Sequence, residues 1–269
     1  MFRFVIKSNH KDEALEHLHS VAIPVTLEDV SQGNESLILS ALGFLGGLLQ
    51  VMKLPLEKQV AVIEALTTKL KNVQEKNQSR KLMWSMANIQ FDDTLPESCL
   101  DAMLNAACMF LREKPPVFSL STVCESLNAL RNMGGRHRAF CEKNLACIFS
   151  AVIPWLFNEA DRIRELSIAC LDPFSSEIAQ RKLLDPNFQA QLRSKYYGIL
   201  NQLVAAETPE SLKIWSFLIQ GFGTELHESV ALLNELLKIE ESALKSKNPG
   251  FRQRALEHWK FIVDCFALN

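Results

Sequence analysis

The chain has almost no excess charge of either sign. Its 269 residues include 29 Lys and Arg against 31 Asp and Glu, which gives a formal net charge of -2. No overall field therefore draws the protein to nucleic acid or to an acidic membrane surface, because attraction of that kind needs a strong excess of basic residues. Any site for phosphate groups has to be local.

The chain also has no long hydrophobic run. Its most apolar stretch, residues 37–52, carries no charge, but it is shorter than the roughly 20 residues that a membrane-spanning helix needs. The apolar part of residues 1–7 is too short for a signal peptide, because polar residues follow it at once. The sequence thus predicts a buried helix over residues 37–52 and no membrane partner.

Cysteine pairs at the spacing of metal or redox sites are missing. None of the seven cysteines forms a Cys-x-x-Cys pair. Most lie within apolar helical patterns, which indicates reduced core thiols in a cytosolic or nuclear protein. The seven are Cys99, Cys108, Cys124, Cys141, Cys147, Cys170 and Cys265.

Strand patterns are nearly absent as well. Alternation of apolar and polar residues is confined to Phe2–Ile6, whereas apolar residues recur every three or four positions almost everywhere else. Pro96, Pro209, Pro249 and the pair Asp185-Pro186 divide the remainder into helical lengths. Helices are predicted over residues 34–53, 56–73, 77–90, 96–113, 120–133, 136–158, 161–171, 175–206, 209–222, 225–244 and 251–268.

Short connections between these helices force neighbours to lie antiparallel, which favours a bundle or an α-solenoid. Helix pairs of roughly 40 to 47 residues, the spacing of HEAT repeats, decide for the solenoid. The predicted pairs are 34–73, 77–113, 118–158, 161–206 and 209–245.

The predicted fold class is therefore all-α: an α-solenoid of HEAT/armadillo-type repeats, with about five pairs and a terminal unpaired helix. Residues 1–33 are predicted to be a divergent N-terminal segment. Residues 34–269 are predicted to be the repeat domain, truncated at its C-terminal end, because a solenoid needs a last repeat with a polar outer face.

The four tryptophans are expected to be core residues. Trp84, Trp215 and Trp259 each lie midway along a predicted first helix of a pair, with aliphatic residues three to five positions on. Exposed tryptophan would serve as a peptide-binding platform, but the aliphatic neighbours favour burial for these three and for Trp155. Residues 161–171, the predicted first helix of the pair 161–206, resemble the HEAT pattern. In that pattern an aspartate in the turn precedes an aliphatic residue that is followed by arginine.

No arrangement of residues indicates catalysis, a metal or a cofactor. His17 and His19 beside Glu13 and Glu16 would supply metal ligands, but no second cluster matches them, which favours a solvated helix face. We therefore assign no catalytic residue and no metal ligand, and the protein is predicted not to be an enzyme.

Two further arrangements fail as chemical motifs. His137 and Cys141 lie four positions apart on one helix face, yet no third group orients them, which favours a structural pair over a thiol dyad. Gly43, Gly46 and Gly47 lie within an apolar helix and lack the Lys-Ser/Thr that completes a phosphate-binding loop.

Local basic clusters are the remaining candidate binding feature. Equivalent turns line up in a solenoid, so clusters far apart in sequence would merge into one ridge that holds the phosphates of DNA or of a phosphopeptide. The alternative, which the small net charge favours, is a set of solvated faces balanced by nearby acids. The candidate phosphate-contacting residues are Arg136, Arg138, Arg193, Lys195, Arg252 and Arg254.

The last third of the chain carries a distinctive series of motifs. They are Leu212-Lys213-Ile214-Trp215, Gly223 with Leu226-His227, Asn234 with Leu236-Leu237, Glu240-Glu241, Pro249, Ala255, Trp259-Lys260, and Asp264 with Phe266-Ala267-Leu268-Asn269. In order and spacing they resemble the end of the N-terminal domain of the Rif family, the Rap-interacting, telomere-associated factors. The resemblance extends less specifically over residues 80–269, and Gly221 departs from it where the family tends to have leucine.

The resemblance implies a scaffold of HEAT repeats in the nucleus, on chromosomes and at telomeres. Members of the family control replication timing by recruiting a type-one protein phosphatase, and they take part in double-strand-break repair. Their phosphatase-docking and C-terminal DNA-binding regions lie outside this stretch, so protein partners on chromatin are expected for it. The alternative is a cytosolic HEAT-repeat adaptor for transport or phosphatase regulation.

Overall fold

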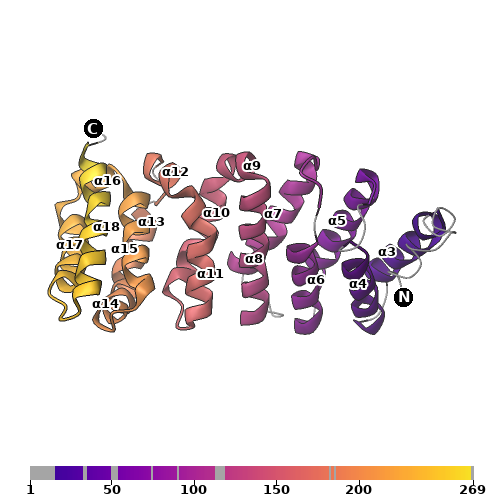
Figure 1. Ribbon diagram of the computed structural model, residues 1–269, viewed down its shortest axis with the longest axis horizontal. Coiled ribbons are helices and arrows are strands. Elements are labelled where there is room, and N and C mark those ends of the chain that lie inside the picture. Colours follow the sequence, from indigo (N-terminus) through magenta and orange to yellow (C-terminus); the bar gives the residue numbers. More distant parts are fainter. Residues whose placement is uncertain are drawn as a thin grey trace. The chain divides into compact units, whose positions relative to one another are not determined.

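The described part of the chain is helical, as its periodicity predicts. The computed structural model describes residues 16–32, 35–49, 54–73, 75–89, 91–112, 119–181, 183–184 and 186–267. Within these ranges every regular element is an α-, 3-10- or π-helix, and no strand occurs (Figure 1). None of these helices is both long and apolar enough to cross a bilayer. Phe2–Ile6, the expected site of alternation, lies outside the described residues.

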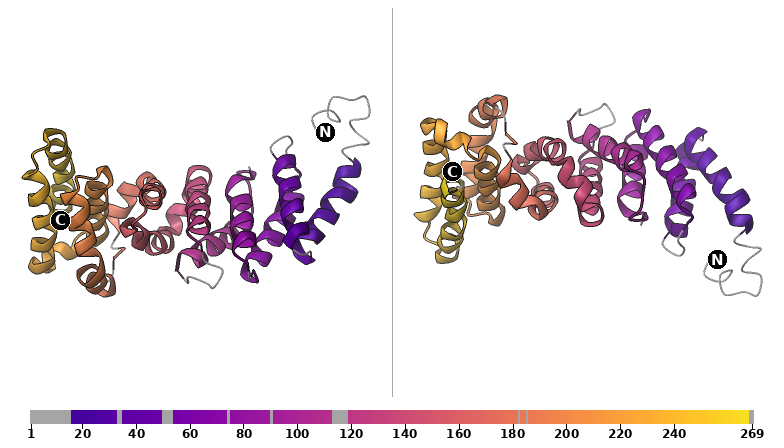
Figure 2. Two further views of the ribbon diagram at one scale, coloured as in Figure 1. Left: turned by 90° about the horizontal axis from the view of Figure 1, so that it is seen from below. Right: turned by 90° about the horizontal axis from the view of Figure 1, so that it is seen from above.

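The chain forms two compact units, residues 1–140 and 141–269. In the first unit, α3, α5 and α7 pack in one row, and α4, α6 and α8 pack in a second row beside it. Two further views show the same neighbours side by side (Figure 2). The helices are α3 (Ile23–Gln32), which follows the π-helical turn Leu18–Ala22, then α4 (Glu35–Leu49), α5 (Leu56–Lys71), α6 (Lys76–Asn88), α7 (Glu97–Arg112) and α8 (Leu120–Arg136).

The helix pairs of the first unit are shifted by one helix from the predicted ones. Consecutive helices pack most extensively as α3 with α4, α5 with α6 and α7 with α8. The predicted pairs 34–73 and 77–113 instead join α4 to α5 and α6 to α7. The predicted grouping of these helices into pairs was therefore wrong. The reason is α3, which supplies the partner of α4 from within the predicted divergent segment. That these residues diverge from the family stays a prediction.

The second unit, taken by itself, also contains a row of packed helices. Helices α11, α15 and α18 follow one another in one row, while α14 and α17 pack beside them. Its elements are α10 (Leu145–Val152), η2 (Ile153–Phe157), α11 (Asp161–Leu171), η3 (Asp172–Phe174), α12 (Ser175–Gln180), α13 (Pro186–Gln191), η4 (Leu192–Tyr196), α14 (Tyr197–Ala205), α15 (Pro209–Phe222), α16 (Glu225–Glu228), α17 (Val230–Leu244) and α18 (Pro249–Ala267); α9 (Arg138–Lys143) spans the division between the units.

Proline and glycine residues of the second unit begin or end helices at the positions that the sequence predicts. Pro209 and Pro249 begin α15 and α18, where the fixed φ of proline suits the first helical turn. The predicted break at Asp185-Pro186 is confirmed, because α12 ends at Gln180 and α13 begins at Pro186. Gly223 follows α15 with φ of 51°, a left-handed conformation that favours glycine at a helix end.

Helix α18 has partners, which corrects the prediction of an unpaired terminal helix. It packs against both α15 and α17, and its Phe251 and Ala255 are fully buried. One apolar stripe of the helix remains on the surface. It consists of Leu256, Trp259, Val263 and Phe266.

Two of the four tryptophans are not core residues. Trp215 is fully buried and donates its Nε1–H to the Leu236 carbonyl at 2.8 Å, and Trp155 is also buried. Trp84 and Trp259 are 37% and 38% exposed, so the expected equivalence of three buried tryptophans was wrong.

The register of each helix explains the two errors. The buried positions of α6 include Ser79, Leu82, Met83 and Met86, which follow the helical period and leave position 84 outside the buried face. The Trp84 ring instead lies on the helix surface, with the Lys81 Nζ 5.6 Å from its centroid. Trp259 belongs to the uncovered stripe of α18. The tryptophans therefore do not mark equivalent positions of the repeats, which are recognised from the packing of the helices.

A buried arginine closes the turn before α11. Arg164 is 3% exposed, and its Nη1 donates to the carbonyls of Asn158 at 2.9 Å and Glu159 at 3.0 Å. Its Nη2 pairs with Asp161, the turn aspartate of the predicted HEAT-type pattern. The Asn158 Oδ1 also accepts the Ala160 N–H, so both ends of the turn are hydrogen-bonded.

The turn before α18 repeats this arrangement. Arg252 lies 88 positions after Arg164, and its Nη1 donates to the carbonyl six residues earlier, that of Ser246, at 2.7 Å. The Ser246 Oγ accepts the Asn248 N–H, as the Asn158 side chain accepts the Ala160 N–H. Since 88 residues is about two repeats of HEAT length, the two turns mark equivalent positions in the array.

We expect Arg164→Met to lower the free energy of unfolding by about 2 to 3 kcal/mol, because two buried carbonyls would be left without a charged donor. Arg162→Met is the matched control: Arg162 is exposed and contacts Glu165 at 3.6 Å, a surface pair that contributes little. Urea unfolding of both variants measures the difference. Equal midpoints for the two would show that Arg164 does not hold the turn.

Candidate functional site

The six candidate phosphate-contacting residues are divided between the two units. Arg136 ends α8 and Arg138 begins α9, both within residues 1–140. Arg193 and Lys195 lie in η4, and Arg252 and Arg254 lie in the first turns of α18. The contacts that Arg136, Arg193, Arg252 and Arg254 make within the chain are described below. A common ridge stays a prediction.

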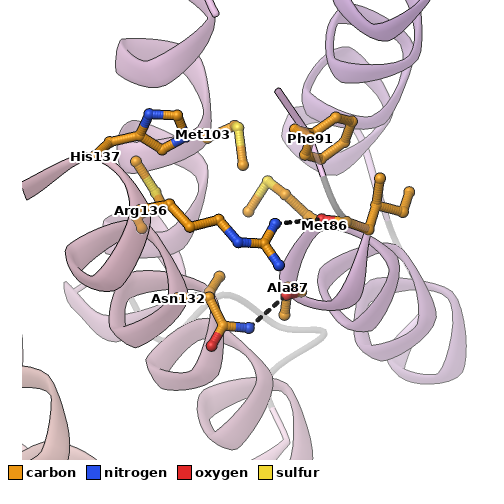
Figure 3. A pocket seen from close by; sticks show the side chains of 10 residues that line it. Met86, Ala87, Phe91, Met103, Asn132, Arg136 and His137 are labelled. Carbon is orange, nitrogen blue, oxygen red and sulfur yellow. Dashed lines mark hydrogen bonds between the residues drawn. The ribbon is translucent and has the colours of Figure 1, made fainter. Parts of the chain in front are cut away.

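Arg136 binds the end of a neighbouring helix. Helix α8 continues through Gly134 and Gly135, where an end was predicted, and this carries Arg136 to the C-terminus of α6. Its Nη1 donates to the Ile89 carbonyl at 3.4 Å, and the Asn132 Nδ2 donates to the Ala87 carbonyl at 2.7 Å (Figure 3). These are carbonyls that the end of α6 leaves without a partner in its own helix.

The space around these two side chains is too small for a ligand. It is a cavity of about 20 Å³, lined on its apolar side by Met86, Met103, Met133 and Phe91 (Figure 3). A volume of that size holds about one water molecule. The arrangement of Asn132 and Arg136 is therefore that of a helix cap. A cap of this kind was not visible in the sequence, because it joins residues about 45 positions apart.

The basic residues of the second unit also bind their own chain. The Arg193 Nε contacts the Glu235 carboxylate at 2.9 Å, and both side chains are partly exposed. Arg252 closes the turn at Ser246, and the Arg254 guanidinium lies 5.8 Å from the centroid of the Phe251 ring. Lys195 is exposed. These contacts support structural roles for part of the set.

Groups that would support metal or thiol chemistry are arranged unfavourably. No cluster of three or more His, Cys, Asp or Glu side chains suitable for a metal occurs among the described residues, and Glu13 lies outside them. Cys141 is fully buried, and burial, with a smaller effect of Glu142, raises the pKa of its thiol to about 11. Burial lowers the pKa of His137. A thiol with so high a pKa is protonated at neutral pH and is a poor nucleophile.

A buried carboxyl group in α17 was not predicted. Glu240 is fully buried, and neither of its side-chain oxygens has a hydrogen-bond partner. Burial alone raises its pKa to about 8. The next residue, Glu241, is exposed and pairs with Lys245, which lowers the pKa of Glu241. The sequence offered one signal, since Glu240 falls at the helical spacing of Leu236 and Ala243, both core residues.

A family model described as Rap1-interacting factor 1 N terminal matches residues 6–269. The chain belongs to this family. Over 253 residues it is 22% identical to the telomere-associated protein RIF1 of Gallus gallus, and over 245 residues it is 23% identical to the protein of that name from Homo sapiens. Each match covers 89% of this chain and 10% of the relative, so the chain spans about a tenth of their length.

Solved structures resemble this chain in fold. A designed armadillo repeat protein in complex with peptide (KR)4 matches with a TM-score of 0.54 and 16% identity, covering 89% of this chain and 99% of that one. Computationally designed armadillo repeat proteins for modular peptide recognition match with a TM-score of 0.55, 14% identity and the same coverage. The predicted α-solenoid of helical repeats is confirmed.

We expect the stability of the protein to fall as the pH rises, in part because of Glu240. The pKa of this carboxyl is about 8 in the folded chain, against 4.5 ordinarily. Its contribution is therefore fully present below pH 4.5 and is lost as the pH rises through 8, since ionisation then opposes burial. Glu240→Gln should unfold at higher urea than the wild type at pH 8.5, and the difference should shrink at pH 5.

Glu241→Gln is the control, because Glu241 lies next to Glu240 but is exposed and has a lowered pKa. It should not raise the urea midpoint at pH 8.5. A Glu240→Gln variant whose advantage is the same at both pH values would contradict the assignment of a buried, protonated carboxyl.

Proposed function

We propose that this chain is the helical-repeat part of a telomere-associated protein of the nucleus and chromosomes, and that it acts there as a non-enzymatic scaffold for protein partners on chromatin. The match of the family model along residues 6–269 carries this proposal, and the name of the relatives supports it. Roles in replication timing, telomere maintenance and double-strand-break repair belong to the same proposal. A type-one protein phosphatase would be bound by regions outside this chain.

Features of the described residues support a scaffold over an enzyme. The buried, protonated Cys141 is unsuited to nucleophilic attack, and Asn132 and Arg136 are used to cap a helix. Stacked helices meanwhile present long surfaces to partners, which is the usual role of helical-repeat proteins. A cytosolic adaptor for transport or phosphatase regulation remains the alternative that the first experiment separates.

We expect the chain to be retained on chromatin in cultured animal cells. Expressed as a fluorescent fusion with an added nuclear import signal, it should resist detergent extraction at physiological salt. A designed armadillo repeat protein in the same fusion is the control, because it shares the fold but not the family. The fusion without the import signal should also be found in the nucleus. Equal extraction of chain and control, with a cytosolic location for the second fusion, would favour the adaptor.

Binding of DNA or a phosphopeptide by the six basic residues is the finer part of the proposal. Its test has to avoid Arg136 and Arg252, because both bind carbonyls within the chain and their removal would disturb the fold. Arg138 and Lys195 have exposed side chains, one in each unit, and are suited to substitution.

We expect Arg138→Gln with Lys195→Gln to weaken binding of duplex DNA and to reduce the slope of log affinity against log salt by about one unit for each phosphate group that the variant no longer neutralises. The measurement is a fluorescence titration at several salt concentrations. Lys71→Gln with Arg80→Gln removes the same charge from exposed positions outside the set and should leave the slope unchanged. Equal effects of the two double variants would reduce the candidate set to ordinary solvated residues.

A further inference from the structure

A second cavity lies in the second unit between α12, α15 and α18. Its volume is about 240 Å³. A water molecule needs only roughly 10–15 Å³, while pockets for drug-sized ligands begin near roughly 300 Å³. The space therefore suits one large side chain. Its lining includes Ser175 and Ala179 of α12, Gln220 of α15, and Lys260, Phe261 and Asp264 of α18.

The wall of this cavity contains a buried amide that lacks a partner. Gln220 is 2% exposed, and its Oε1 accepts no hydrogen bond. A buried acceptor without a donor is unfavourable, and native proteins rarely keep one without a reason. Gln220 also lines the cavity, so a donor that enters the cavity lies close to this amide. The Gln220 side-chain oxygen thus lacks a hydrogen-bond donor.

A carboxylate and an aromatic ring complete the lining. Asp264 is exposed and forms no ion pair with another described residue. Phe261 is half-buried, and its ring lies 5.6 Å from the His258 ring. Burial, and next the charge of Lys213, lowers the pKa of His258 to about 4, so this neighbour is neutral at physiological pH. The acceptors and the ring suit a flat group that is rich in donors.

We propose that this cavity receives the arginine side chain of a partner protein. A guanidinium group carries five N–H donors and no acceptor. It would donate to the Gln220 Oε1 and to the Asp264 carboxylate, and its flat face would stack on the Phe261 ring. The ammonium of lysine is more compact and more strongly hydrated, and it matches the ring and the two acceptors less well. This inference does not depend on binding of chromatin or DNA.

The Lys260 side chain lies in part of the same space. Its Nζ lies 5.2 Å from the centroid of the Phe261 ring. An entering guanidinium displaces this ammonium from the ring and is repelled by its charge. Removal of Lys260 should therefore strengthen binding, whereas removal of either acceptor should weaken it. A merely structural role for these residues gives no such opposite signs.

The experiment is an NMR titration of the whole chain with N-acetyl-L-arginine amide. N-acetyl-L-citrulline amide, nearly the same shape but neutral, and N-acetyl-L-lysine amide are the comparison probes. We expect saturable binding of the arginine probe with a dissociation constant of about 1 mM, a shift of the Gln220 side-chain amide signal, and binding of citrulline and lysine at least about 5-fold weaker.

Variants test each part of the site. Asp264→Asn and Gln220→Met should weaken binding of the arginine probe by about 5-fold or more, and Lys260→Met should strengthen it. Glu257→Gln and Gln253→Met are the controls: they too convert a carboxylate to an amide and a glutamine to a methionine, but at exposed positions of α18 outside the cavity, and they should have no effect. Because Asp264 and Lys260 are exposed, their variants report even if Gln220→Met unfolds the chain. Absence of saturable binding, equal binding of citrulline, or unchanged affinity in Asp264→Asn would overturn the proposal.

Discussion

The helices of this protein bury their apolar faces against neighbours that are close in sequence. Helix α6 packs against α4, α5 and α8, and α15 packs against α11, α12, α14 and α18. A helix pair of this kind cannot cover its apolar surface alone and depends on the next pair in the row. Each buried side chain, from Phe110 in α7 to Trp215 in α15, is therefore held by a local set of helices.

Arginine side chains secure the polar groups that this packing leaves at helix ends. Arg164 and Arg252 bind carbonyls in the turns before their own helices, and Arg136 binds a carbonyl at the end of α6. A basic residue near a helix end thus has two possible uses, a ligand outside the chain or a carbonyl within it. Composition does not separate them, because the choice depends on which carbonyl lies within reach of the side chain.

The sequence predicts the bounds of a helix well where proline or turn residues lie beside it. The bounds 161–171 and 209–222 agree with α11 and α15, since turn residues or Pro209 lie beside both helices. The repeat phase and the exposure of Trp84 were not predictable from local pattern, because both depend on which helix faces which. Gln220 and Glu240 were missed for the same reason: their lack of partners is a property of several packed helices and not of one.

The two equivalent turns, one before α11 and one before α18, have a consequence for how such an array changes over generations. Each carries its own bonds, from Asn158 to Arg164 and from Ser246 to Arg252. A duplicated segment that starts at such a turn would bring the closing hydrogen bonds with it. The array can therefore gain or lose whole repeats while its remaining turns stay intact, and length becomes a property that selection can adjust in steps.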